Sequence, residues 1–257
     1  MTTTIAFTNQ KGGVGKTSVT LHLGGTLAEM GYKTLLVDLD QQGNLSSVFL
    51  DNVDSMDKTI VDLFMNGATI NEVRRTTNVQ NLDILPANLS LVDLDLMTAG
   101  DDDAQYMLMD GLSPIRSEYD FILIDCPPNL GRATRMAYIA ANYLIIPIEC
   151  KEWAVRGSNK IMMMMDKVKK RANPDIELMG FIINLFDSKR VIEQQYNRIL
   201  RQTYGNKVFK TEFRNNVQYT ESVTARTSIN HYAPSSDQAE SFRELAKEIV
   251  ANVKIKK

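Results

Sequence analysis

Cysteine, histidine and tryptophan are scarce in this chain of 257 residues, which contains two, two and one of them respectively. Two cysteines, Cys126 and Cys150, are too few for a disulfide framework or a zinc site built on cysteine. His22 and His231 have no carboxylate at a metal-binding or catalytic-triad spacing. These absences argue against a disulfide-stapled secreted protein, a zinc protein and a histidine-dependent hydrolase.

Long hydrophobic stretches are also missing, since no uninterrupted run of about 18 apolar residues occurs. The first residues lack the charged segment, apolar segment and small-residue cleavage site of a secretory signal peptide. With 44% apolar and 23% charged residues, the composition is that of an ordinary globular protein. We therefore expect a cytoplasmic protein. Because no linker divides the chain, we expect a single domain over residues 1–257.

The formal net charge of −2 hides a difference between the two parts of the chain. Residues 1–150 contain 9 Lys and Arg against 19 Asp and Glu, a balance of −10. Residues 151–257 contain 20 against 12, a balance of +8. The basic second part is consistent with an anionic partner and equally with a solvated surface.

Short apolar runs alternate with helix-like segments, which predicts an α/β protein with an open, mostly parallel twisted sheet and helices on both faces. Several runs are almost continuously apolar, as strands buried on both faces should be. The expected strands are residues 4–8, 33–38, 82–87, 120–125, 143–148 and 178–184. The expected helices are residues 16–30, 58–65, 89–98, 103–117, 131–141, 154–172, 191–204 and 237–253.

The stretch NQKGGVGKTS at residues 9–18 joins an expected strand to an expected helix, which is the context of a phosphate-binding loop. Glycines let backbone N–H groups turn toward a phosphate, and the helix N-terminus adds partial positive charge. In such a loop Lys16 binds the β- and γ-phosphates of ATP, and Thr17 is a ligand of Mg²⁺. The predicted ATP site consists of Gly12, Gly13, Val14, Gly15, Lys16, Thr17 and Ser18.

The loop departs from the usual pattern G-x-x-x-x-G-K-[ST] in two ways. Gln10 stands at the position of the first glycine, and an additional lysine, Lys11, precedes the glycine pair. The loop pattern by itself does not explain this second lysine.

Acidic residues end two further apolar strands. Asp125 ends DFILID, and at the carboxyl edge of a buried strand it would hold Mg²⁺ directly or through water. Asp38 and Asp40 end LLVDLD and point to the same side if the strand continues that far. One of these two carboxylates is expected to orient water for attack on the γ-phosphate.

KGGVGKTS, VDLDQQGN and DFILIDCPP, in this order and spacing, resemble the ParA/Soj branch of the deviant Walker-type partition ATPases. The resemblance covers essentially the whole chain and is to the short form without an N-terminal helix-turn-helix. It implies an ATP-dependent homodimer in which Lys11 contacts the phosphates of the ATP held by the other subunit. It also implies that Asp40 is the hydrolytic carboxylate, touching Mg²⁺ through water, and that Asp125 is the Walker B residue. Lys11, Lys16 and Asp40 are then the catalytic residues.

Two positions differ from the family pattern. Gln41 follows Asp40 where the family usually has proline, so the rate of hydrolysis is open in either direction. Asn215 and Gln218 stand where arginines linked to DNA contact are often found, so those contacts are not carried over. Similar C-terminal segments make Asn184 and Asn216 candidates for the adenine contact.

A basic segment offers another route to DNA. Non-specific duplex binding requires phosphate contacts and no base readout. We expect nucleoid DNA to bind seven residues between positions 189 and 214, in the ATP form and with aromatic residues interleaved. The alternative is a solvated helix face with the aromatic rings in the core. The seven residues are Lys189, Arg190, Arg198, Arg201, Lys207, Lys210 and Arg214.

The leading hypothesis is an ATPase that binds DNA as an ATP dimer, and whose slow hydrolysis is stimulated by a ParB-like or other small adaptor protein. Its cargo would be a plasmid, a chromosome origin or a protein body such as the carboxysome. The alternative is a membrane-surface ATPase resembling MinD, which the core-like pattern of residues 237–253 disfavours. A nitrogenase-reductase-like electron donor is rejected because Cys126 and Cys150 are not placed to share an iron–sulfur cluster across a dimer. The four methionines at 162–165 indicate core packing, or less strongly a dimer or adaptor surface.

Overall fold

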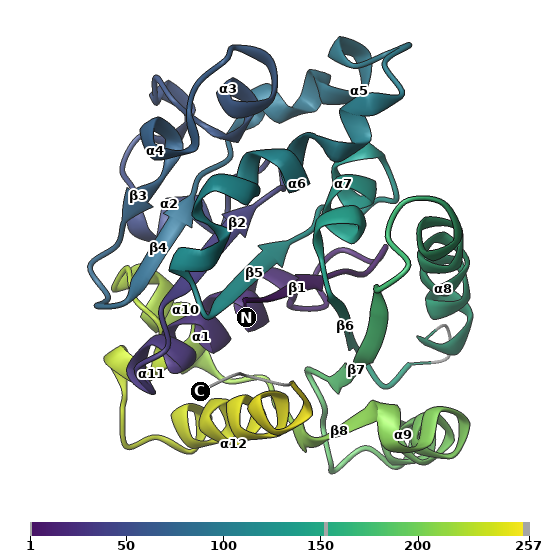
Figure 1. Ribbon diagram of the computed structural model, residues 1–257. Coiled ribbons are helices and arrows are strands. Elements are labelled where there is room, and N and C mark those ends of the chain that lie inside the picture. Colours follow the sequence, from purple (N-terminus) through teal and green to yellow (C-terminus); the bar gives the residue numbers. More distant parts are fainter. Residues whose placement is uncertain (1, 152–153, 254–257) are drawn as a thin grey trace.

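A computed structural model describes residues 2–151 and 154–253, without the side chains of residues 154–156. An eight-stranded sheet has the order β3-β4-β2-β5-β1-β6-β7-β8 (Figure 1). Neighbouring strands are parallel except β3 and β4, which are antiparallel. The strands are β1 (Thr3–Phe7), β2 (Thr34–Asp38), β3 (Arg75–Thr76), β4 (Leu82–Leu85), β5 (Phe121–Asp125), β6 (Tyr143–Ile148), β7 (Glu177–Ile183) and β8 (Val208–Glu212).

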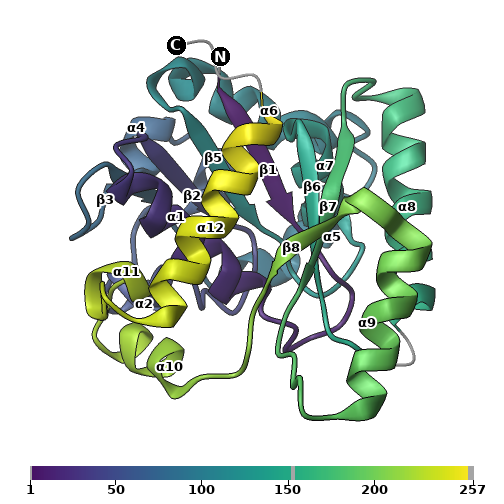
Figure 2. The ribbon, with the colours of Figure 1, turned by 90° about the horizontal axis from the view of Figure 1, so that it is seen from below.

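Helices connect the strands and cover both faces of the sheet (Figures 1 and 2). The longer ones are α1 (Lys16–Glu29), α7 (Arg132–Ala140), α8 (Ala154–Arg171), α9 (Val191–Tyr204), α10 (Val217–Thr224) and α12 (Asp237–Asn252). The shorter ones are α2 (Ser46–Phe49), α3 (Ile60–Met65), α4 (Ile70–Val73), α5 (Leu94–Met97), α6 (Met107–Leu112) and α11 (Ile229–Tyr232). Short stretches of 3-10 helix are η1 (Val53–Ser55), η2 (Leu89–Asp93), η3 (Asp103–Tyr106), η4 (Ser113–Glu118) and η5 (Gly205–Lys207).

Side chains that alternate along the strands build two hydrophobic cores. In β1, Ile5 and Phe7 belong to the core beneath α1 and α12, whereas Ala6 belongs to the core beneath α7 and α8. All five residues of β1 are buried. Burial on both faces is why this strand and its neighbours are almost continuously apolar.

The predicted fold class and all six predicted strands are confirmed. The prediction missed β8, an edge strand whose sequence VFKTE mixes buried and exposed positions and therefore has no continuous apolar run. It also missed α10 and α11, which follow β8. The predicted helix at 103–117 is wrong as one element, because η3, α6 and η4 divide it.

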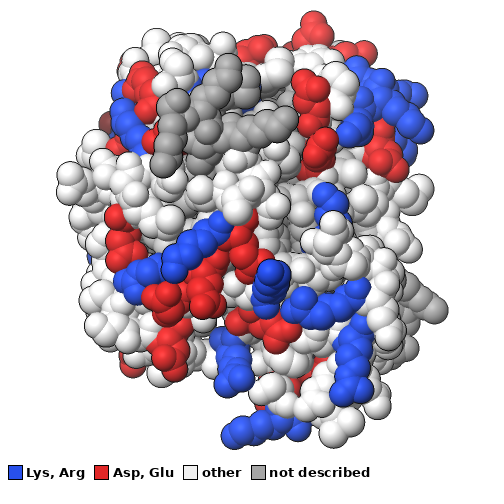
Figure 3. All heavy atoms as spheres, turned by 60° about the horizontal axis from the view of Figure 1, so that its bottom comes forward, with Lys and Arg blue, Asp and Glu red and all other residues white. Residues whose placement is uncertain are grey.

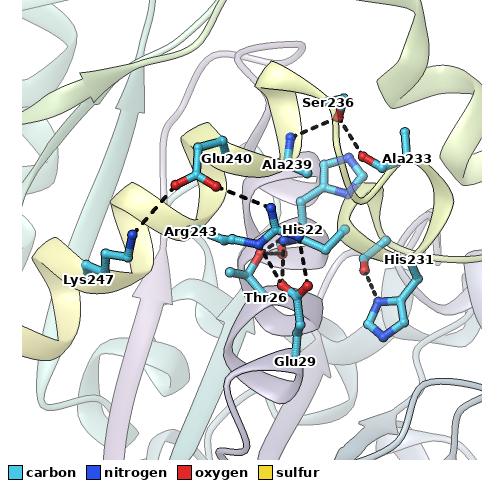
Figure 4. Close-up of polar contacts among 12 residues, drawn as sticks. His22, Thr26, Glu29, His231, Ala233, Ser236, Ala239, Glu240, Arg243 and Lys247 are labelled. Atoms are coloured by element: carbon cyan, nitrogen blue, oxygen red, sulfur yellow. Dashed lines mark hydrogen bonds and ion pairs between the residues drawn. The ribbon is translucent and has the colours of Figure 1, made fainter.

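Helix α1, which begins at the glycine loop, is fixed to α11 and α12 by polar contacts (Figure 4). Arg243 of α12 donates to both carboxylate oxygens of Glu29, at 2.8 and 3.1 Å. Thr26 donates to Asn230 at 2.7 Å, and the backbone N–H of Ile229 donates to Nδ1 of His22 at 3.1 Å. Segments about 200 residues apart in sequence thus hold α1 in place beneath the loop.

Candidate nucleotide-binding site

The glycine loop lies at the carboxyl edge of the central strands. It follows β1, whose last residue, Phe7, is in register with Asp125 at the end of β5. Asp125 is in turn in register with Asp38 at the end of β2. Three predicted segments that lie far apart in sequence therefore meet at one edge, where open α/β sheets bind their ligands.

Two glycines give the loop its shape. Gly13 and Gly15 have φ values of 75° and 86°, in the left-handed region that favours glycine. A Cβ atom on Gly15 would overlap the side-chain amide of Asn184. That amide donates to the carbonyl oxygen of Val14 at 2.8 Å. Gly15 is therefore required both for its backbone conformation and for the close approach of Asn184.

Lys16 lies at the start of α1 and is only 7% exposed. Its Nζ atom is 3.5 Å from the carbonyl oxygen of Lys11, and no ion pair of Lys16 occurs in the described part of the chain. An ammonium group held inside a glycine loop at a helix N-terminus is suited to bind an anion. Thr17 and Ser18, the next two residues, are partly exposed on the first turn of the helix.

Lys11 has a partner within its own chain. Its Nζ atom lies 3.0 Å from Oε2 of Glu149, which also pairs with Lys151. Although burial opposes it, the two lysines hold the pKa of Glu149 below its ordinary value. The sequence prediction missed Glu149, although its pattern is similar to that of Asp125. In IIPIE the carboxylate directly follows an apolar strand, and in FILID it ends one.

Asp125 is a buried carboxylate at this edge. It is 1% exposed, and within residues 2–151 and 154–253 neither of its side-chain oxygens accepts a hydrogen bond of good geometry. Burial, together with the negative charge of Asp38, raises its pKa well above the ordinary value, against the lowering effects of the nearby Thr17 side chain and of Lys16. Such a carboxylate is costly to bury unless it is protonated or faces a cation. Its two oxygens beside the loop therefore fit a Mg²⁺ ligand.

Asp38 and Asp40 have different roles in the structure. Asp38 is fully buried and accepts hydrogen bonds from the backbone N–H and hydroxyl of Ser46, at 2.9 and 2.7 Å. Burial raises its pKa to about 6, against the lowering effect of these bonds. Asp40 is 9% exposed and accepts from the backbone N–H of Gln42 at 3.0 Å. Asp38 thus anchors the loop that presents Asp40.

Asn184 and Asn216, the predicted adenine contacts, lie on neighbouring segments. The backbone N–H of Phe213 donates to the carbonyl of Ile183, which brings the two chain segments together. The side chain of Asn216 caps α10 by accepting from the backbone N–H of Gln218 at 2.9 Å. Each asparagine side chain therefore has a hydrogen-bond partner within the chain, and contact with adenine stays a prediction.

The predicted DNA-binding segment contains α9 and β8. In Figure 3, several Lys and Arg side chains lie toward the lower right of the view, with some Asp and Glu between them, and a further group lies at the upper right. The side chains of Lys189, Arg198, Lys210 and Arg214 are exposed, with no ion pair inside the described residues. The other three have partners in the same chain. Arg190 pairs with Asp187 and Glu193, Arg201 pairs with Glu212, and Lys207 donates to the carbonyl of Leu178.

The aromatic rings of this segment serve the core. Tyr204 stacks on Phe181 with ring centroids 4.2 Å apart, and Phe209 and Phe213 are 5% and 1% exposed. Since these rings face inward, they are not available to stack on nucleic-acid bases. Any DNA contact must come from the exposed cations.

Two family profiles match the sequence. One, described as AAA domain, matches residues 2–178. The other, described as 4Fe-4S iron sulfur cluster binding proteins of the NifH/frxC family, matches residues 107–256. Cys126 and Cys150 are both buried, and burial raises the pKa of the Cys150 thiol to about 12 and that of Cys126 further. Neither thiol is exposed for a shared cluster.

Curated relatives and solved structures give a consistent picture. The chromosome-partitioning ATPase Soj of Treponema pallidum is 37% identical over 96% of this chain and 97% of that protein. The sporulation initiation inhibitor protein Soj of Bacillus subtilis is 33% identical over 96% of this chain and 98% of that protein. Cobyrinic acid a,c-diamide synthase from Mycobacterium smegmatis, solved with an ATP analog and magnesium, superimposes with a TM-score of 0.88 at 27% identity. That match covers 99% of this chain and 96% of the other.

The sheet order and the glycine loop define a P-loop ATPase. Within that class, the chain belongs to the Soj/ParA family of chromosome-partitioning ATPases. None of the helices in residues 2–151 and 154–253 combines the length and hydropathy that crossing a bilayer requires.

Proposed function

We propose that the whole chain is one ATPase domain that binds ATP with Mg²⁺, dimerises in the ATP form and positions a cargo. The observation that carries the proposal is the buried carboxylate of Asp125 beside the glycine loop, which has no counter-cation in contact with it among the described residues and lies close to Thr17. Loop and carboxylate together supply what a Mg²⁺–nucleotide complex needs, namely N–H donors, an ammonium group and an anionic ligand. The ATP-analog and magnesium complex of the similar synthase supports the same cofactors.

Each residue of the edge has a distinct part in this reaction. The N–H groups of residues 12–18 and the ammonium of Lys16 would hold the phosphates, while Thr17 and Asp125 would hold Mg²⁺, Asp125 directly or through water. Bound Mg²⁺ neutralises charge that develops on the phosphates. Asp40 would orient the attacking water and would contact Mg²⁺ through water, while Asn184 and Asn216 would contact the adenine. Asp38 acts only by holding the loop of Asp40.

Lys11 links hydrolysis to dimerisation. Its position next to Glu149 is the resting position in one subunit. When two ATP molecules face each other in a dimer, the phosphates attract Lys11 of the opposite subunit. The γ-phosphate then favours the closed dimer, which is a shift of an existing equilibrium by a ligand that binds one state better.

The closed dimer presents the basic segment of residues 189–214 twice, and doubled phosphate contacts strengthen non-specific DNA binding. An adaptor of the ParB-like or another small type stimulates hydrolysis and releases the DNA. The protein then works in the cytoplasm on the nucleoid, and its cargo is a plasmid, a chromosome origin or a protein body. A membrane-surface role is disfavoured because the apolar face of α12 is buried against α1.

Two single substitutions test the proposal. Lys16→Ala should abolish binding of a fluorescent ATP analog, whereas Lys11→Ala should keep much of this binding. Light scattering with ATP and Mg²⁺ should then show a monomer for Lys11→Ala and a dimer for the parent protein. Equal loss of nucleotide binding in both variants would show that Lys11 serves its own subunit.

A further inference from the structure

A hollow of about 850 Å³ lies outside the nucleotide site, bounded by α7, α8, α5 and η3. Figure 1 shows α5, α7 and α8 toward the right of the view, away from α12. Its lining contains no residue of the glycine loop, neither Asp40 nor Asp125, and none of the basic segment at 189–214. The proposed ATPase cycle leaves this hollow without a role.

Positive charge dominates the lining. Two carboxylates, Asp95 and Asp102, stand against five basic side chains. Apart from Arg132, these basic groups form no ion pair or hydrogen bond within the described ranges, and they are exposed. The five are Arg132, Arg135, Lys160, Lys167 and Arg171.

The carboxylate of Asp95 accepts a hydrogen bond at the start of α7. Its Oδ1 atom accepts from the backbone N–H of Arg132 at the start of α7, at 3.2 Å. The Arg132 guanidinium donates to the carbonyl oxygen of Asp101 at 2.8 Å. Asp95 therefore compensates the positive end of α7. Five basic side chains against two carboxylates still leave a surplus of three positive charges in the lining.

The wall of the hollow is partly apolar. Met163 is 61% exposed although it lies in a run of four methionines, and Met164 and Leu130 line the same space. Of that run, Met165 is buried, so the sequence prediction of core packing holds for part of it only. Exposed methionine adapts its shape to different apolar side chains, which suits a surface that binds peptides.

We infer that this hollow binds an acidic, partly apolar peptide segment of a partner protein. Unpaired cations supply the attraction for Glu and Asp side chains, and Met163, Met164 and Leu130 receive apolar ones. A DNA duplex is less suited to this hollow, because its charged backbone offers no apolar group that these three residues could contact. The inference extends the adaptor of the proposed function, but peptide binding requires no ATP hydrolysis, so the two can fail separately.

Fluorescence anisotropy of the full chain, without nucleotide, tests this binding. The probe is a labelled twelve-residue peptide with the repeat Glu-Glu-Leu-Ser. Lys160→Gln with Lys167→Gln should weaken its binding about tenfold, since two ammonium groups no longer attract the acidic side chains at a partly apolar site. The matched control is Lys169→Gln with Lys170→Gln, which makes the same charge change on the same helix outside the hollow and should stay within about twofold.

Three comparisons decide the outcome. A peptide with the repeat Lys-Lys-Leu-Ser should fail to bind, and one with Glu-Glu-Ser-Ser should bind more weakly than the first. Equal binding by both double variants would overturn the inference. It would also be overturned if a DNA duplex displaced the peptide and lost affinity equally in the variant of Lys160 and Lys167. A third contrary outcome is that this variant loses self-association while its affinity for the peptide is unchanged. Thermal unfolding and ATP hydrolysis confirm that each variant is folded.

Discussion

The glycine-loop edge and the basic segment at 189–214 both contain lysines suited to phosphate, but they hold them differently. At the edge, Lys16 is 7% exposed, and Asp125 is buried with no hydrogen bond of good geometry to its carboxylate among the described residues. In the basic segment the four unpaired cations are exposed to solvent, and the other three have partners in their own chain. Burial without a partner costs free energy and therefore indicates a ligand. An exposed cation costs little, so it indicates a ligand only weakly.

The largest effect is expected at Gly15. Gly15→Ala forces a side chain into the left-handed region and into the amide of Asn184, so the loop must shift. We expect ATP affinity to fall by at least about 100-fold, because a displaced loop no longer directs its N–H groups at the phosphates. Isothermal titration with ATP and Mg²⁺ measures this decrease.

Gly67→Ala is the matched control for Gly15. Gly67 also has a positive φ, of 67°, but nothing lies within 4 Å of its Cβ position. This control should lower stability by about 1 kcal/mol and leave ATP affinity unchanged. If Gly15→Ala binds ATP as well as Gly67→Ala does, the left-handed backbone at Gly15 is not required for nucleotide binding.

The basic segment should respond in a graded manner. Replacing Lys189, Arg198, Lys210 and Arg214 by Ala should lower the slope of log K against log salt by about 0.9 for each phosphate that the variant no longer neutralises. Filter binding of the ATP form to a duplex at several salt concentrations gives this slope. Arg190→Ala is the control, because its guanidinium is paired with Asp187 and Glu193. An unchanged slope in the fourfold variant would show that these four side chains do not contact DNA.

His22 tests the rule that buried, unpartnered atoms indicate a ligand. Among the described residues its Nε2 atom has no hydrogen-bond partner, but the ring, on α1, packs against Tyr219 of α10 and Phe242 of α12. Burial lowers its pKa from 6.5 to about 3, so between these values the unfolded chain binds a proton that the folded chain does not. The stabilisation is complete above pH 6.5 and is lost as pH falls toward 3, by up to about 1.4 kcal/mol per pH unit.

Urea unfolding between about pH 7 and pH 5 measures this dependence. His22→Asn keeps an acceptor for the N–H of Ile229 and should reduce the slope with pH. His231→Asn, at an exposed position, should leave the slope as in the parent protein. If the two variants behave alike, His22 is not the group responsible.

The smallest effect concerns the Lys11–Glu149 pair. Glu149→Gln should release Lys11 and strengthen ATP-dependent dimerisation by about two- to fivefold, the range of one partly exposed ion pair. Lys151→Gln leaves the pair intact and should change dimerisation less. Analytical ultracentrifugation at several protein concentrations distinguishes them. Weaker dimerisation in Glu149→Gln would place Glu149 itself in the dimer interface.

Much of the edge was predictable because its determinants are local. A glycine loop between a strand and a helix, and a carboxylate at the end of a buried strand, are short patterns set by backbone geometry. Glu149 was missed although its pattern is similar, since its partner Lys11 lies 138 positions away. The contact of Asn184 with Val14 spans 170 positions and was likewise beyond reach.

The sequence alone determined the α/β fold, the phosphate loop and the acidic strand ends, because continuous apolar runs and glycine spacing act over a few residues. Only the tertiary structure decided which charges are buried, paired or free. It separated Asp38, which accepts hydrogen bonds from Ser46, from Asp125, whose oxygens accept none of good geometry among the described residues. It likewise separated Arg201, paired with Glu212, from Arg198, which has no ion pair in the same ranges. It also brought the cations of α7 and α8 around one hollow. The physical reason is that desolvation and charge pairing depend on distances through space, which the order of residues does not specify.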